Sequence, residues 1–181
     1  MPIQKSARIA CLSAVLFSGE TLAGPTGVQV AGGSAGFAQR GNLLTVTNSP
    51  GAILNWQKFS IDAGETVRFV QQNAQSAVLN RVVGKDPSAI LGSLQSNGRV
   101  FLVNPNGIVF GRGARIDVAG LVASSLDIAD ADFAAGRLNF SGNAASRAVR
   151  NDGNIATPDG GLVYLIAPDV SNAGIVTAPN G

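Results

Sequence analysis

Three carboxylates lie close together in the sequence, Asp127, Asp130 and Asp132, and they are the residues most suited to chemistry. Such a group could bind calcium, or supply the acid and base of a β-helical polysaccharide-cleaving enzyme. However, the segment lacks the glycine and the closing glutamate that an EF-hand loop requires. We therefore interpret Ala-Asp-Ala-Asp as the cap of a helical turn or a solvated loop, and predict no metal ion, no cofactor and no catalytic residue here.

The rest of the composition removes the commonest catalytic side chains. The chain has no histidine, and its single cysteine, Cys11, lies in a segment that we expect to be cleaved off. Histidine-based triads, zinc sites and thiol nucleophiles are thereby excluded from the mature chain. We predict that the protein is not an enzyme.

The N-terminus has the order of features found in a secretory signal peptide. Lys5 and Arg8 provide a positive region, residues 9–17 are apolar, and residues 21–23 form a small-x-small site, so cleavage is expected after Ala23. The apolar run is too short to cross a bilayer. This order favours a signal peptide at residues 1–23 over a buried N-terminal strand or helix.

Charge gives no sign of a nucleic-acid partner. The formal net charge is +2, and it falls to +1 when the predicted signal peptide is removed. The arginines are dispersed along the chain, without the basic run that a phosphate-binding groove requires. We therefore predict no nucleic-acid binding.

The elements that would position any site are short β-strands. From residue 42, short β-branched and apolar runs alternate with turn clusters of Asn, Gly, Asp and Pro, which is typical of an all-β chain. Only residues 88–94 and 127–135 are candidates for a helical turn. Residues 24–41 are rich in Gly and Ala and are expected to form a leader or N-terminal cap, with one short strand near residues 28–31.

An internal repeat favours a parallel β-solenoid over a sandwich or barrel. Asn151-Asp152-Gly153 is echoed by Asn172-Ala173-Gly174 at a separation of 21 residues, about the length of one β-helical coil. Stacked asparagines can form hydrogen-bonded ladders in such a fold. We count Asn106-Gly107-Ile108 as an earlier, weaker echo. The pattern is interrupted at Gly181, so residues 42–181 are predicted to be a β-helical domain truncated at its C-terminal end.

Residues 77–128 resemble the N-terminal two-partner-secretion, or haemagglutination-activity, domain of filamentous haemagglutinin-like exoproteins. The resemblance rests on Asn80-Arg81-Val82, on the stretch 97–103, on Asn104-Pro105-Asn106-Gly107-Ile108, and on the stretches 116–118 and 120–128. It implies a right-handed parallel β-helix that serves as the secretion domain of a large adhesin or haemagglutinin. A haemolysin or contact-dependent toxin exported in the same way, and the polysaccharide-cleaving enzyme, are the alternatives.

The resemblance also implies partners and a location. The chain would cross the inner membrane through the Sec translocon, and the periplasmic domains of an Omp85-type outer-membrane transporter would then recognise it. The protein would be secreted or displayed on the cell surface, where a downstream region would contact host or neighbouring cells.

One turn carries the predicted recognition motif. Pro105 fixes φ, and Asn106 and Gly107 tolerate positive φ, so this turn is expected to reverse the chain between residues 100–103 and 108–110. The resemblance implies that the turn, with the region of Asn80 and Arg81, forms the structure that the transporter recognises. We expect its structural role to be primary, because recognition requires the turn to form.

Overall fold

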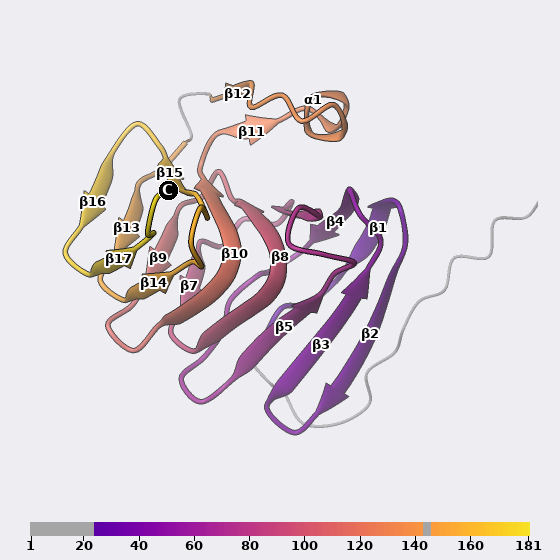
Figure 1. Cartoon of the computed structure of the whole chain (residues 1–181), viewed down its shortest axis with the longest axis horizontal. Helices are drawn as coiled ribbons and strands as arrows, with labels where there is room; N and C mark the ends of the chain where they lie inside the picture. The colour runs from indigo at the N-terminus through magenta and orange to yellow at the C-terminus, as the bar shows by residue number, and fades with distance from the viewer. Residues whose placement is uncertain (1–23, 143–145) are drawn as a thin grey trace, which may run out of the picture.

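The computed structural model describes residues 24–142 and 146–181, so the predicted signal peptide lies outside the described residues. The described chain is almost entirely β-structure (Figure 1). The strands are β1 (Gln29–Gly32), β2 (Ala35–Arg40), β3 (Leu43–Asn48), β4 (Ala52–Trp56), β5 (Thr66–Val70), β6 (Ala77–Val82), β7 (Ser88–Ile90), β8 (Ser93–Val103), β9 (Ile108–Phe110), β10 (Arg115–Ser124), β11 (Asp127–Ile128), β12 (Phe140–Ser141), β13 (Val149–Asn151), β14 (Asn154–Ala156), β15 (Val163–Ile166), β16 (Val170–Asn172) and β17 (Ile175–Thr177). The helix α1 spans Asp130–Ala134, and no helix in the described ranges is long and apolar enough to cross a membrane.

Successive coils stack in parallel and give the solenoid three faces. The first face consists of β3, β5, the first halves of β8 and β10, β14 and β17. The second consists of β4, β6, the second halves of β8 and β10, and β15. The third consists of β7, β9, β13 and β16. The predicted parallel β-solenoid is confirmed.

An antiparallel cap closes the N-terminal end of two faces. β2 pairs antiparallel with β3 on the first face, and β1 pairs antiparallel with β4 on the second. The predicted cap is therefore confirmed, but its leader contains two strands rather than one. We missed β2 because only Phe37 among its six residues is a strong β-former.

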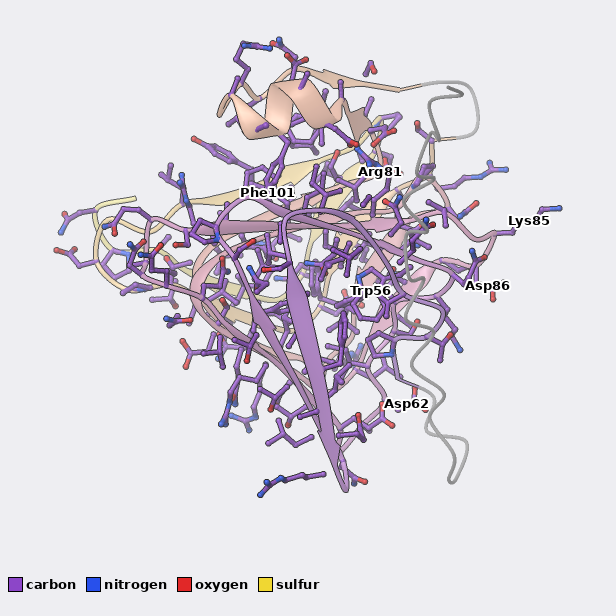
Figure 2. The ribbon with its side chains drawn as sticks, turned by 90° about the vertical axis from the view of Figure 1, so that its right-hand side faces the viewer. Trp56, Asp62, Arg81, Lys85, Asp86 and Phe101 are labelled. Carbon is purple, nitrogen blue, oxygen red and sulfur yellow. The ribbon has the colours of Figure 1, made fainter. Side chains whose placement is uncertain are left out.

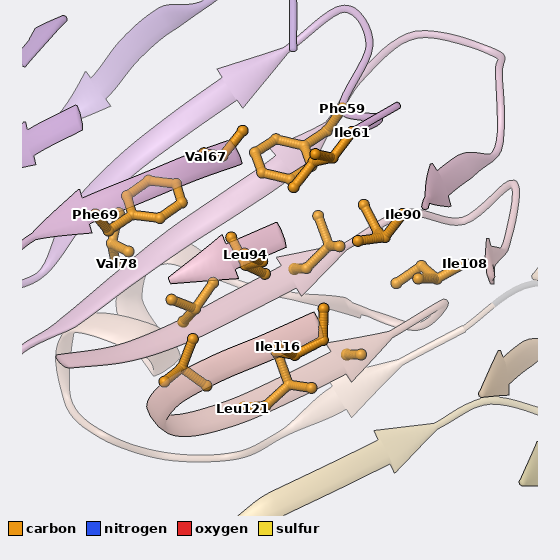
Figure 3. Packing of buried hydrophobic residues seen from close by; sticks show 14 of the residues in the cluster. Phe59, Ile61, Val67, Phe69, Val78, Ile90, Leu94, Ile108, Ile116 and Leu121 are labelled. Atoms are coloured by element: carbon orange, nitrogen blue, oxygen red, sulfur yellow. The ribbon is translucent and has the colours of Figure 1, made fainter. Parts of the chain in front are cut away.

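The interior is a single apolar column to which all three faces contribute (Figure 3). Side chains alternate along each strand, so every second residue enters this column while its neighbours point outward. Its fully buried members include Phe59, Phe69, Ile90, Leu94 and Ile116. The low content of charged residues fits this fold, because most strand positions that point inward are apolar.

One coil carries an excursion, and its described part at residues 125–142 lies over the outside of the second face. On the third face, Val149 pairs with Val170, which lies one ordinary coil further along the chain. Ile108 pairs with Val149 in the same way, but the longer stretch of chain between them includes the additional residues. The excursion contains β11, α1 and β12 and buries Phe133 against Phe101, with ring centroids 5.1 Å apart. A second apolar cluster thereby forms outside the solenoid wall.

Of the two predicted helical turns, only the one at residues 127–135 forms, as α1. Asp130 and Asp132 lie in its first turn, but Ala129 is the N-cap residue and no side chain caps the helix. The prediction of a helical turn at residues 88–94 is wrong. Residues 88–90 form β7, because Ser88 and Ile90 point inward and the strand pairs with β9.

The 21-residue repeat corresponds to one coil. Asn151 pairs in register with Asn172, and its Nδ2 donates a hydrogen bond to the Oδ1 of Asn172 over 2.9 Å. The earlier echo at residues 106–108 shares residue types with these two segments but not their register, because Ile108 pairs with Val149 and not with Ile155.

Candidate functional site

The Asn104-Pro105-Asn106-Gly107 segment forms a tight corner between two faces. The Gly107 amide donates a hydrogen bond to the Asn104 carbonyl over 3.0 Å, and Gly107 has φ of 101°. Asn106 does not adopt positive φ. The predicted reversal is wrong, because the second half of β8 lies on the second face and β9 lies on the third, so the turn redirects the chain around the solenoid.

Asn104 is completely buried and its side chain forms four hydrogen bonds. Its Nδ2 donates to the Asp86 carbonyl and to the Ser88 hydroxyl, both over 3.0 Å. Its Oδ1 accepts hydrogen bonds from the backbone amide and the Nδ2 of Asn106, also over 3.0 Å. Asn104 therefore joins the turn to the loop that precedes β7 in the previous coil.

Asn106 strengthens the same connection. Its Nδ2 also donates to the Gly84 carbonyl over 2.9 Å, so both asparagines hold the loop of residues 83–87. This loop is itself tightly packed, because a Cβ on Gly84 would lie 1.9 Å from the Gln57 carbonyl oxygen.

The remaining motif residues connect the turn to the next coil and to the core. The Pro105 carbonyl accepts a hydrogen bond from the Arg147 amide over 3.0 Å. A Cβ on Gly107 would lie 3.0 Å from the Ala148 carbonyl oxygen, so glycine is required both for its φ and for this approach. Ile108 is fully buried in the central column.

Asn80 lies on β6 and points into the solenoid, where it is fully buried. Its Oδ1 accepts a hydrogen bond from the indole Nε1 of Trp56 over 3.0 Å, and its Nδ2 donates to the Phe101 carbonyl over 3.3 Å. Trp56 is 1% exposed, so Asn80 supplies the partner that a buried indole N–H requires. A buried side chain of this kind cannot contact another protein while the fold is intact.

Arg81 is the next residue of β6 and points to the other side of the sheet, where it holds the excursion (Figure 2). Its guanidinium bonds Asp127 over 2.9 Å, Asp130 over 2.8 Å and the Ile128 carbonyl over 2.5 Å. Burial by itself would lower the pKa of Arg81, but the hydrogen bonds and charges of Asp127 and Asp130 outweigh it and raise the pKa. Arg81 thus remains charged and tethers the excursion to the second face.

Each of the three carboxylates that the sequence brings close together has an arginine partner in the structure. Asp127 and Asp130 pair with Arg81, and Asp132 pairs with Arg137 over 2.7 Å. Within residues 24–142 and 146–181, no group of three or more His, Cys, Asp or Glu residues is placed to hold a metal ion.

The seven motif residues therefore do not come together in a single site. Residues 104–108 form one corner with the loop of residues 83–87, whereas Asn80 and Arg81 act on opposite sides of β6. Sequence reasoning missed Trp56, Gly84 and Ser88 as partners of the motif. The one sequence feature that could have pointed to such a partner is that Trp56 is the single tryptophan of the chain, since a buried indole N–H requires an acceptor.

Comparisons with known proteins agree with this architecture. Residues 23–180 match the TPS secretion domain family. The solved HMW1 secretion domain of Haemophilus influenzae superposes with a TM-score of 0.81 at 40% sequence identity, covering 84% of this chain and 42% of that chain.

Two curated proteins of Haemophilus influenzae, each named heme/hemopexin-binding protein, are 40% and 36% identical over 105 and 102 residues. The matched stretches cover 58% and 56% of this chain but only 12% and 11% of those proteins.

Proposed function

Because the chain belongs to the TPS secretion domain family, we propose that it is the export module of a larger exoprotein and that an outer-membrane two-partner-secretion transporter recognises it. The observation that carries this proposal is the family match over residues 23–180, supported by the superposition on the HMW1 secretion domain. The family is one of secretion domains and not of enzymes, and we propose that the chain has no catalytic role.

The proposed route has two membrane steps. The signal peptide at residues 1–23 would direct the chain to the Sec translocon and be cleaved near Ala23. In the periplasm, the solenoid would bind the periplasmic domains of an Omp85-type transporter and then reach the medium or the cell surface. A solenoid suits this route, because each coil contacts mainly its neighbours and coils can therefore add one at a time to a formed end.

The larger exoprotein is proposed to be an adhesin or haemagglutinin that contacts host or neighbouring cells through regions beyond this chain. The curated relatives are named for binding heme or hemopexin, but this chain matches about an eighth of their length. We propose that this segment serves export, because the family match covers residues 23–180.

Co-expression with the cognate transporter tests the proposal. We expect the chain to accumulate in the medium only when the transporter is present, as measured by immunoblotting of medium and periplasm. A periplasmic marker protein controls for lysis. Equal export with and without the transporter contradicts the proposed function.

A further inference from the structure

The outer surfaces of the three faces differ in chemistry. On the first face, Arg68, Gln95 and Asp117 lie in one register row, and the Nε of Arg68 donates to the Oε1 of Gln95 over 3.0 Å, so this surface is polar. The second face is covered by the excursion, which buries Phe101 and Phe133. Among residues 24–142 and 146–181, no such segment covers β7 and β9 of the third face.

The outward side of β7 and β9 is apolar, whereas the next residue in the same row, Arg150 of β13, is charged and pairs with Asp152. Residues 87, 89 and 91 alternate with the buried Ser88 and Ile90, and they therefore share the outward side of β7. Ala89 pairs in register with Val109 of β9. Leu91 is 39% exposed and Val109 is 38% exposed. We name Pro87, Ala89, Leu91 and Val109 the apolar strip.

The motif turn holds one end of this strip in place. Asn104 and Asn106 bind the carbonyls of Asp86 and Gly84, and the Ser88 amide donates to the Gly107 carbonyl over 3.0 Å. The loop of residues 83–87 also exposes Val83, which is 50% accessible. A surface fixed in this way loses little conformational entropy when a partner binds.

Exposed cations border the strip at both ends. Lys85 precedes β7 and Arg147 precedes β13, while Arg112 follows β9. None of these three residues takes part in the ion pairs found among the described residues. Figure 2 shows Lys85 extending outward beside Asp86. A partner with an apolar centre and carboxylates at its rim would complement this surface.

We propose that the apolar strip, with Lys85 and Arg147 at its rim, is the surface that docks on the periplasmic domains of the transporter. This inference rests on the proposed function and deepens it. It assigns the contact to outward-facing residues of the third face and gives the buried asparagines of the motif a supporting role.

The test compares two valines of similar exposure on different faces. Val109→Glu places a carboxylate on the strip, and Val70→Glu places one on the first face, where Val70 is 40% exposed. Affinity for the whole transporter in detergent is measured for each variant, together with export in co-expressing cells. We expect Val109→Glu to weaken binding by about tenfold or more and Val70→Glu to bind as wild type.

Lys85→Glu tests the charged rim and should slow association with the transporter, most strongly at low salt.

Thermal unfolding of each variant separates docking from folding. If Val109→Glu lowers the unfolding temperature more than Val70→Glu does, Leu91→Gln replaces it as the test of the strip. Wild-type affinity and export in both strip variants would overturn the inference, and so would an equal loss in Val70→Glu. A change in self-association without a change in transporter binding would assign the strip to a second copy and also overturn it. Failure of the wild-type chain to depend on the transporter would instead contradict the proposed function.

Discussion

Replacement of Asn80 by alanine separates a structural role of this residue from direct recognition. The substitution removes the acceptor of the Trp56 indole and the donor to the Phe101 carbonyl, at a side chain with no exposed surface. An unpaired buried N–H costs about 1–3 kcal/mol. The space left by the amide adds about 1 kcal/mol. We therefore expect the free energy of unfolding to fall by about 2–4 kcal/mol, a large share of the total for a domain of this size.

Urea unfolding followed by fluorescence measures this change directly, because Trp56 is the only tryptophan in the chain. Asn154→Ala is the matched control. Asn154 is exposed on β14, and its loss should change the free energy by less than about 0.5 kcal/mol. Export of Asn80→Ala should fall in proportion to the unfolded fraction and recover at lower temperature. Unchanged stability together with lost export would refute the structural assignment and make Asn80 a contact residue.

Three further substitutions test the other elements of the fold. Arg81→Ala should lower the free energy of unfolding by about 1–2 kcal/mol, because its carboxylate partners are half exposed; amide hydrogen exchange should show lost protection in residues 127–134 but not in the second face. Gly84→Ala should cost at least about 3 kcal/mol, since its Cβ would overlap a carbonyl oxygen, whereas Gly36→Ala, with open space around it, should leave the thermal midpoint nearly unchanged. Asn151→Ala breaks the asparagine ladder and the bond to the Gly153 amide, and it should cost about 1–3 kcal/mol and speed exchange in β16 and β17.

The sequence predicts the all-β solenoid because its signals are local. Short apolar runs bounded by turn residues indicate strands, and the spacing between Asn151 and Asn172 equals one coil. The excursion was not predicted, because nothing near residues 125–148 shows that the chain leaves the solenoid and returns one coil later. β7 was also missed, since a three-residue strand is too short to show a period and is defined by its pairing with β9.

The candidate site was predicted in part for the same reason. The requirement for glycine at Gly107 follows from local turn geometry and is observed. The partners of Asn104, which are Asp86 and Ser88, lie in the previous coil and carry no local signal. Likewise, nothing in the order Asn80-Arg81 predicts that one side chain faces Trp56 inside while the other holds the excursion outside.

On our proposal, the buried asparagines support the exported fold and are not themselves the contact with the transporter. Asn80, Asn104 and Asn151 have no exposed surface, and each uses its amide to join two coils. An apolar column forbids a slip of one residue, which would turn its side chains outward, but a slip of two residues keeps them inside. A buried amide allows only the register in which its donor and acceptor are both paired. Substitutions at these positions should therefore impair export through loss of the stack, whereas substitutions on the apolar strip should impair it with the stack intact. Measurements of stability and of transporter affinity for the same variants therefore distinguish the buried residues that support the surface from the exposed residues that would contact the transporter.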